Sequence, residues 1–192
     1  MGTLSSFLAY RTNPADSPNI ICIDWESLSR PIVYKVCPNY VPGRSYRGPA
    51  QYAIQIGQLL GPSLVENILV RGLGQQPNFI HAIGHSLGSH LVGNMARYFA
   101  NSYGTRISRV TGLDPAMPYF RNWPYGMENK IDRNDAEFVD IIHSNSGDIN
   151  HGCLSFPEAL GDVDFYPNGG EHQPMCLEEG KMGLCDIVNK GK

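Results

Sequence analysis

Short apolar runs alternate with segments of helical periodicity along this chain. Runs with the length of buried strands cover residues 19–25, 79–83, 106–114 and 136–143, and a shorter run with polar and apolar alternation covers 162–166. Apolar residues recur at helical spacing over 51–60 and 91–100, and more weakly over 63–70. Strands that alternate with helices predict an α/β fold with a mostly parallel central sheet.

The ends of this pattern differ from its middle. Residues 19–25 follow a turn-rich segment and have the composition of a fully buried parallel strand, and only a possible helical turn at residues 4–9 precedes them. The stretches 144–161 and 167–192 are rich in Gly, Asn, Pro and Glu. Such long loops are typical of segments that border a functional site.

The most informative motif is GHSLG at residues 84–88, between the run at 79–83 and the helix at 91–100. A G-x-S-x-G motif in this context predicts a nucleophile elbow, with Ser86 at its strained apex and with Gly84 and Gly88 leaving room for the turn. The Leu87 N–H would lie at the helix start and stabilise a developing oxyanion. A bare match can arise by chance among 21 glycines. The flanking strand and helix favour the nucleophile.

An elbow serine requires a base and an acid that orients the base. Asp114 closes the strand after the elbow helix, so adjacent parallel strands would bring it to the same edge as Ser86. The alternative to a catalytic role is that Asp114 only begins the turn formed with Pro115. Three histidines follow, His143, His151 and His172. His143 closes a strand and is the best candidate base, although a histidine there is more often structural.

Composition excludes several classes of protein. The chain has 192 residues, of which 42% are hydrophobic and 17% charged, which indicates one globular domain. A net charge of −3 offers no basic patch for nucleic acid. No apolar run approaches the ~20 residues of a transmembrane segment, and the first ten residues do not resemble a secretory signal.

The five cysteines do not form a C-x-x-C metal or redox pattern. Cys22 with Cys37, and Cys176 with Cys185, could form local disulfides in an oxidising compartment. Ordinary buried thiols are an equally good interpretation.

Four motifs in order resemble the animal pancreatic-lipase family: GHSLGSH at 84–90, TGLDPA at 111–116, DAEFVDIIH at 135–143 and GDVDFYPNGG at 161–170. The likeness is greatest to the arthropod lipases and phospholipases A1, and it covers nearly the whole chain. It implies the α/β-hydrolase fold and hydrolysis of acyl esters in neutral lipids or phospholipids. It also implies an extracellular protein that meets its lipid substrate at a membrane or lipid-droplet interface.

The same resemblance implies roles for individual residues. Ser86 would be the nucleophile, Asp114 the triad acid and the Leu87 N–H one oxyanion donor. No cofactor would be required, but the family carries a structural calcium ion. Asp132 and Asp135 align with two of its carboxylate ligands, and Glu128 is a looser match because the loop is longer. An ordinary solvated acidic loop is the alternative.

Two features of the family have no counterpart. Nothing before residue 19 matches the His-Gly-Phe-like segment of the second oxyanion donor, and the chain stops at Lys192, where the Cys-Ser-His-like motif of the catalytic histidine is due. We therefore expect residues 1–192 to be part of a single lipase domain that lacks its first strands and its catalytic histidine. The alternatives are a non-catalytic lipid-binding relative, like the family's yolk proteins, and an inactive fragment.

Overall fold

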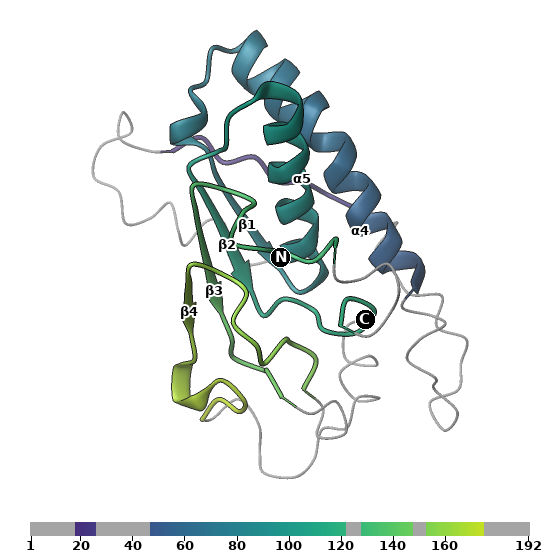
Figure 1. Ribbon diagram of the computed structural model, residues 1–192, viewed down its shortest axis with the longest axis vertical. Helices are drawn as coiled ribbons and strands as arrows, with labels where there is room; N and C mark the ends of the chain where they lie inside the picture. Colours follow the sequence, from purple (N-terminus) through teal and green to yellow (C-terminus); the bar gives the residue numbers. More distant parts are fainter. Residues whose placement is uncertain (1–17, 26–46, 122–127, 148–152, 175–192) are drawn as a thin grey trace.

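The computed structural model describes residues 18–25, 47–121, 128–147 and 153–174. Its helices are α4 (Arg47–Leu60), the π-helix η3 (Gly61–Gly72), the 3₁₀-helices η4 (Pro77–Phe79) and η6 (Pro167–Gly169), and α5 (Leu87–Tyr103). Its strands are β1 (His81–His85), β2 (Arg109–Leu113), β3 (Phe138–Ile142) and β4 (Val163–Phe165). All strand pairs are parallel in the order β1-β2-β3-β4, and α4 and α5 lie together beside the sheet (Figure 1). The predicted α/β fold is confirmed.

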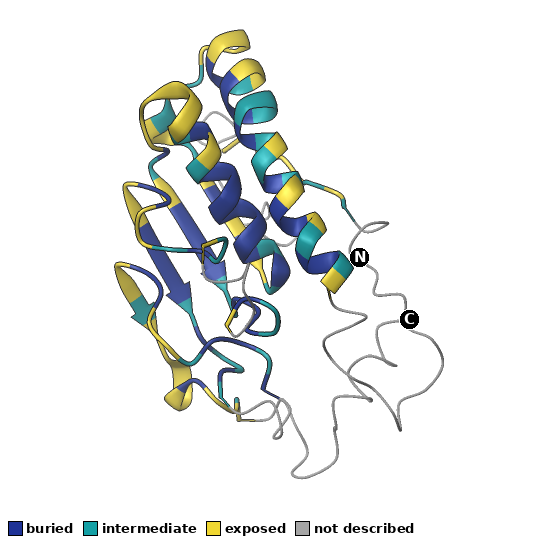
Figure 2. Ribbon diagram, turned by 45° about the vertical axis from the view of Figure 1, so that its right-hand side comes forward, coloured by how far each residue is buried: buried dark blue, intermediate teal, exposed yellow. Residues whose placement is uncertain are grey.

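Alternation along the strands separates the two faces of the sheet. In β1, Ala82 is buried whereas its neighbour Ile83 is 57% exposed. The register pairs Ala82 with Val110, and Val110 with Val139. Because successive side chains in a strand point to opposite faces, these three buried residues share one face. Figure 2 shows the buried positions of the strands and helices turned toward one another. The core lies between this face and α5.

The two long helical segments pack unusually closely. A Cβ atom at Gly57 of α4 would lie 2.4 Å from the Leu91 carbonyl oxygen, and one at Gly61 would lie 2.5 Å from the Met95 carbonyl oxygen. Only glycine allows backbones to approach to this extent. This contact fixes α5, and with it the turn that precedes α5, against the rest of the fold.

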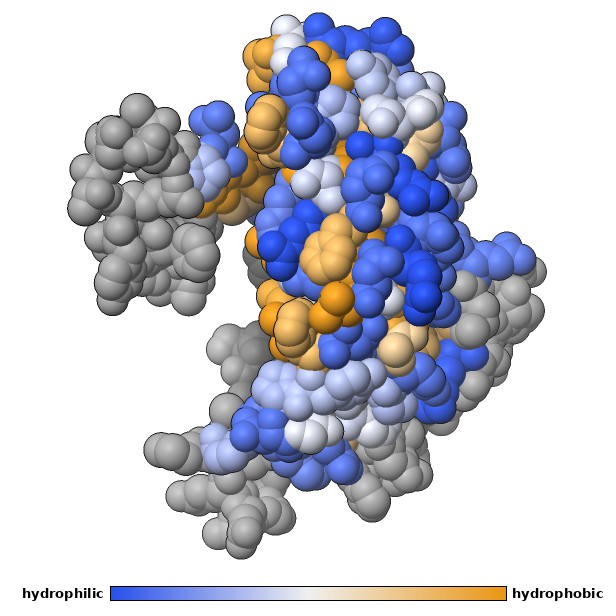
Figure 3. Space-filling view, turned by 60° about the vertical axis from the view of Figure 1, so that its left-hand side comes forward, coloured by the Kyte–Doolittle hydropathy of each residue, from blue (hydrophilic) through white to orange (hydrophobic). Residues whose placement is uncertain are grey.

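The other face of the sheet carries apolar side chains that the described residues leave exposed. Ile83 and Phe165 are more than half exposed, and Phe138 and Val163 are more than a third exposed. The register places all four on the face opposite Val110. Figure 3 shows apolar side chains gathered between polar ones on this side of the molecule.

The predicted buried strand at 19–25 is wrong. These residues have no strand structure, and Ile20 and Ile21 are 45% and 55% exposed. An apolar run becomes a buried strand only when it finds a ladder partner and cover on both faces, and this run does not pair with β1. Cys22 lies in it as an exposed free thiol, so the suggested bridge to Cys37 is not formed. The possible helical turn at 4–9 lies outside the described residues, as do Cys176 and Cys185.

One helical stretch in the described part of the chain, Arg47–Gly72, is long and apolar enough to cross a membrane by length and composition alone. The sequence pattern did not single it out, because polar residues interrupt its apolar residues. Ala50, Ala53 and Val65 belong to the core. The stretch packs on α5, and a core helix of a soluble protein passes the same test, so length and composition are weak support for a membrane span.

Candidate active site

Ser86 stands between the end of β1 and the start of α5 in a strained conformation. Its φ is 55° and its ψ is −119°, which non-glycine residues rarely adopt. The Ser86 N–H donates to the Leu113 carbonyl at 2.8 Å, and the Ser86 carbonyl accepts from Ala116 N–H at 3.3 Å. Hydrogen bonds to the last residue of β2 and to the segment that follows it therefore hold the sharp turn. This is the backbone geometry of a nucleophile elbow.

The two motif glycines have different roles. A Cβ atom at Gly84 would lie 2.1 Å from the Gly88 carbonyl oxygen and 2.7 Å from the Ser89 nitrogen, so the turn closes only around glycine. A Cβ atom at Gly88 would meet nothing within 4 Å. In the structure, Gly84 is the glycine that leaves room for the turn, whereas Gly88 has open space around its Cβ position.

A buried serine ties the two strand ends together at this turn. The Ser89 hydroxyl lies 2.9 Å from the Gly84 carbonyl oxygen and 3.3 Å from the Leu113 carbonyl oxygen. Gly84 precedes the elbow and Leu113 precedes Asp114, so one side chain bridges the backbone of both candidate site segments. Sequence reasoning missed this residue because a serine in a helix carries no special signal.

The first turn of α5 provides an electropositive backbone next to Ser86. α5 begins at Leu87 and runs for 17 residues without an acidic residue in its first turn. The first N–H groups of a helix have no intrahelical acceptor, and the helix dipole adds partial positive charge there. The Leu87 N–H can therefore donate to an oxyanion that forms on an acyl group attached at Ser86.

Asp114 lies directly after β2, at the same sheet edge as Ser86. Its φ of 46° is also unusual, and its N–H donates to the Ile142 carbonyl at 2.8 Å. Its carboxylate accepts hydrogen bonds from the Ser144 N–H at 2.6 Å, the Asn145 N–H at 2.9 Å and the Ser144 hydroxyl. The residues that follow β3 thus fix the orientation of this carboxylate. The strand-end rule that selected Asp114 would also have pointed to Ser144.

His143, the fallback candidate for the base, is fully engaged elsewhere. Its Nδ1 lies 2.7 Å from the Phe156 carbonyl oxygen, and its Nε2 lies 2.8 Å from an Asp164 carboxylate oxygen. The ring is buried and stacks on Tyr166 with the centroids 4.4 Å apart. No ring nitrogen remains to take a proton from Ser86, so this geometry favours a structural role. His151 lies outside the described residues, and His172 is exposed beside Glu171.

His90 connects the segment after Asp114 with the 128–135 loop. The Ile131 N–H donates to Nδ1 at 3.1 Å, so this nitrogen carries no proton and Nε2–H donates to the Ala116 carbonyl at 2.8 Å. Burial lowers the pKa of His90 to about 3, which keeps the ring neutral. The ring also stacks on Phe120 at 3.7 Å. The neutral His90 ring therefore helps to hold Ala116, whose N–H bonds to the Ser86 carbonyl.

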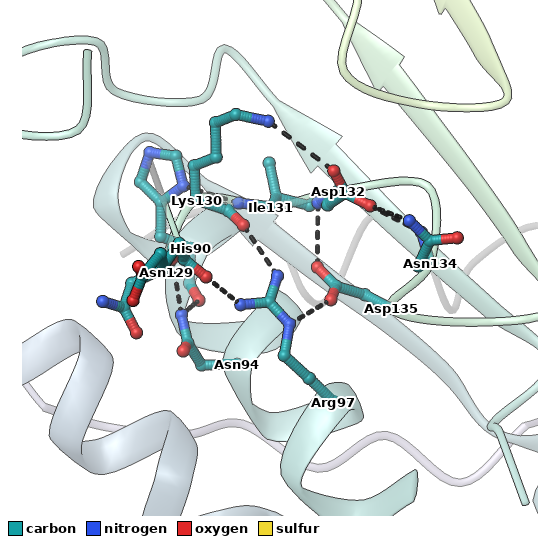
Figure 4. A network of polar contacts seen from close by, with 10 residues as sticks. His90, Asn94, Arg97, Asn129, Lys130, Ile131, Asp132, Asn134 and Asp135 are labelled. Carbon is teal, nitrogen blue, oxygen red and sulfur yellow. Dashed lines mark hydrogen bonds and ion pairs between the residues drawn. The ribbon is translucent and has the colours of Figure 1, made fainter. Parts of the chain in front are cut away.

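The acidic 128–135 loop surrounds a guanidinium group (Figure 4). Arg97 of α5 donates to Asp135 Oδ1 at 2.7 Å, to the Lys130 carbonyl at 2.9 Å and to the Glu128 carbonyl. The second Asp135 oxygen accepts from the Asp132 N–H at 2.8 Å. Although Arg97 opposes it, burial raises the pKa of the Asp135 carboxyl to about 6.

The Asp132 carboxylate also has partners within the loop. The Asp132 carboxylate accepts two hydrogen bonds from Asn134 and lies 3.7 Å from the Lys130 Nζ atom. Glu128 is exposed. Calcium needs several oxygen ligands directed at one point. In this arrangement Asp132 and Asp135, two of the residues predicted to bind calcium, do not fit the ion, because their carboxylate oxygens already contact Arg97, Asn134 and Lys130.

We expect Arg97→Ala to lower the free energy of unfolding by about 3 kcal/mol, because it leaves the buried Asp135 carboxylate without its cationic partner. A calcium chelator is expected to leave the melting temperature unchanged. The melting temperatures of the wild-type protein and of Arg97→Ala, each measured with calcium and with chelator, test both expectations. Arg106→Ala is the matched control, because Arg106 is exposed and should change stability by less than about 0.5 kcal/mol.

The opposite pattern would contradict the ion-pair interpretation. If calcium raises the melting temperature and Arg97→Ala does not lower it, then the loop is organised by the metal ion and not by the guanidinium.

Comparisons with known proteins identify the family of this chain. The model of the Lipase family matches residues 7–189. Pancreatic triacylglycerol lipase of Mus musculus is 37% identical over 174 residues, which are 90% of this chain and 33% of that protein. Pancreatic lipase-related protein 3 of Homo sapiens is 37% identical over 162 residues, which are 82% of this chain and 29% of that protein. Lipase member H of Mus musculus is 36% identical over 158 residues, with the same two shares of 82% and 29%.

The chain thus spans about a third of the length of the curated relatives it matches. The family match covers nearly all of it, and it includes the strand, the strained serine and the helix of the elbow. The chain therefore belongs to the pancreatic lipase family, and its parallel sheet is that of the α/β-hydrolase fold.

Proposed function

We propose that this chain carries the nucleophile and the acid of an extracellular lipid ester hydrolase, a triacylglycerol lipase or a phospholipase A1. The observation that carries the proposal is the conformation of Ser86, whose φ of 55° is maintained between β1 and α5 at some conformational cost. Strain of this kind presents the serine oxygen outward at the end of a parallel sheet. The relatives named triacylglycerol lipase support the lipid substrate.

In this proposal each residue has one task. The Ser86 Oγ attacks the acyl carbonyl carbon, and its proton goes to a histidine base. The carbonyl oxygen becomes an oxyanion that accepts a hydrogen bond from the Leu87 N–H. Collapse of the tetrahedral intermediate expels the alcohol, which takes the proton from the base, and leaves an acyl ester on Ser86. Water then releases the fatty acid by the reverse sequence of proton transfers.

The base would be a histidine outside the described residues. Within the described part of the chain, the Asp114 carboxylate bonds to Ser144 and Asn145, and the nitrogens of His90 and His143 are bonded elsewhere. An acid of a triad orients its histidine by accepting a hydrogen bond from it. Asp114 would do this with an oxygen lone pair that the backbone donors leave available.

A substrate comparison tests the proposed function. A form of the protein that includes the histidine base is incubated with a triacylglycerol emulsion and with phosphatidylcholine vesicles, and released fatty acid is measured. We expect fatty acid from at least one substrate, and the preferred substrate distinguishes the lipase from the phospholipase. Binding to both lipids without any release would instead support the non-catalytic lipid-binding relative. Lipase and phospholipase activity would then both be excluded.

A further inference from the structure

A group of three metal-ligating side chains lies apart from Ser86, where the loop after β3 meets the segment after η6. The Cys153 Sγ atom, a Glu171 carboxylate oxygen and a His172 ring nitrogen all lie within 4.8 Å of one another. The Glu171 oxygen and the His172 Nε2 atom are 3.7 Å apart. Sulfur, oxygen and nitrogen donors from two separate segments therefore meet at one point.

The separations fit a tetrahedral ion after a small adjustment. Zinc bonds of about 2.3 Å to sulfur and about 2.0–2.2 Å to nitrogen and oxygen place tetrahedral ligands about 3.3–3.6 Å apart. The side chains of His172 and Glu171 are about half exposed, 54% and 50%, so both can rotate by the required amount. Cys153 is fully buried and provides a fixed donor.

The backbone around this group is already organised. The Ser146 N–H and hydroxyl both contact the Gly170 carbonyl, at 2.8 and 3.0 Å, and this fixes the residue before Glu171. The Gln173 amide donates to the Ser144 carbonyl at 3.0 Å and fixes the residue after His172. Pre-organised ligands lose less conformational entropy when an ion binds.

Glycine at position 147 leaves the space that the group occupies. Gly147 has a φ of +143°, and a Cβ atom there would lie 3.3 Å from both the Cys153 Sγ atom and a Glu171 carboxylate oxygen. The backbone of this glycine thus lies next to the sulfur and the carboxylate. Any larger residue would crowd the donors.

From this arrangement we propose that Cys153, Glu171 and His172 form a binding site for zinc, with the fourth position open to water. A thiolate, an imidazole and a carboxylate select zinc over calcium or magnesium, which prefer oxygen donors. Binding releases the thiol proton to solvent, and the two negative ligands balance the charge of the ion. The bound ion fastens the segment after η6 to the loop whose Ser144 and Asn145 hold Asp114. The site does not depend on the chemistry proposed for Ser86.

The test uses the full chain, freed of metal and titrated with zinc chloride alone or cobalt(II) chloride alone. We expect one ion per chain, and with cobalt a thiolate-to-metal charge-transfer band in the near ultraviolet. Cys153→Ser should abolish the band. Cys22→Ser should keep the band, because Cys22 is an exposed thiol that does not belong to this group. His172→Ala alters only an exposed side chain and should weaken zinc affinity at least about 10-fold.

Two results would overturn the proposal. One is a titration in which no charge-transfer band develops, or in which the band persists in Cys153→Ser. The other is a zinc affinity that His172→Ala leaves unchanged. Because both readouts measure binding, they remain informative if the protein hydrolyses no ester.

Discussion

In a form of the protein that includes the histidine base, replacing Ser86 with alanine is expected to lower kcat for ester hydrolysis by about 10⁴- to 10⁶-fold. The serine oxygen forms the covalent intermediate in the proposed reaction, so its loss removes the whole acyl-enzyme route. The remaining rate would come from substrate binding and from the N–H groups at the start of α5. Hydrolysis of p-nitrophenyl butyrate by the purified variant measures this loss.

Ser63→Ala provides the matched control for this substitution. Ser63 lies in η3, and its hydroxyl makes one exposed hydrogen bond to the Leu59 carbonyl one turn earlier. It should keep wild-type activity and stability within about 0.5 kcal/mol. Equal activity in Ser86→Ala and Ser63→Ala would show that another residue performs the chemistry.

Replacing Gly84 with alanine is expected to destabilise the fold by about 5 kcal/mol, which is comparable with the whole stability of a small domain. The added methyl carbon would lie 2.1 Å from the Gly88 carbonyl oxygen and 2.4 Å from the Gly88 carbonyl carbon. Both are backbone atoms, so no side-chain rotation can relieve the contact. The start of α5 would have to move away from β1, and the Ser86 turn would open with it. Chemical denaturation monitored by circular dichroism measures the loss.

Gly88→Ala is the matched control for Gly84→Ala, because it places the same methyl group on the other glycine of the motif. A methyl group there meets no atom within 4 Å, and alanine favours the helix by up to about 1 kcal/mol over glycine. We expect stability equal to or slightly above wild type. A similar loss of stability in both variants would mean that the strand and helix do not approach as the structure shows.

The elbow could be predicted from the sequence because its physics is local. A short apolar strand, a glycine, a serine and a helical repeat follow one another directly along the chain, and each constrains the next. The position of Asp114 needed one further rule, that neighbouring parallel strands end at the same edge. The pairing of β1 with β2 confirms that step.

Other features depend on contacts between distant segments, which periodicity does not reveal. The run at 19–25 has the composition of a buried strand but has no ladder partner in the structure. Asp135 matched a calcium ligand, yet its partner is Arg97, which lies 38 positions earlier in the sequence. His143 could be placed at a strand end, but its bonds to Phe156 and Asp164 depend on how two later loops fold back.

Reaction with diethyl p-nitrophenyl phosphate tests most directly whether Ser86 is the nucleophile of the site, in a form of the protein that includes the histidine base. Attack by the serine oxygen forms a bond to phosphorus and releases p-nitrophenolate. Mass spectrometry of the digested protein is expected to show one diethylphosphoryl group on Ser86 and none on the Ser86→Ala variant. A modification located on a different serine, or one that forms equally in the variant, would contradict the claim.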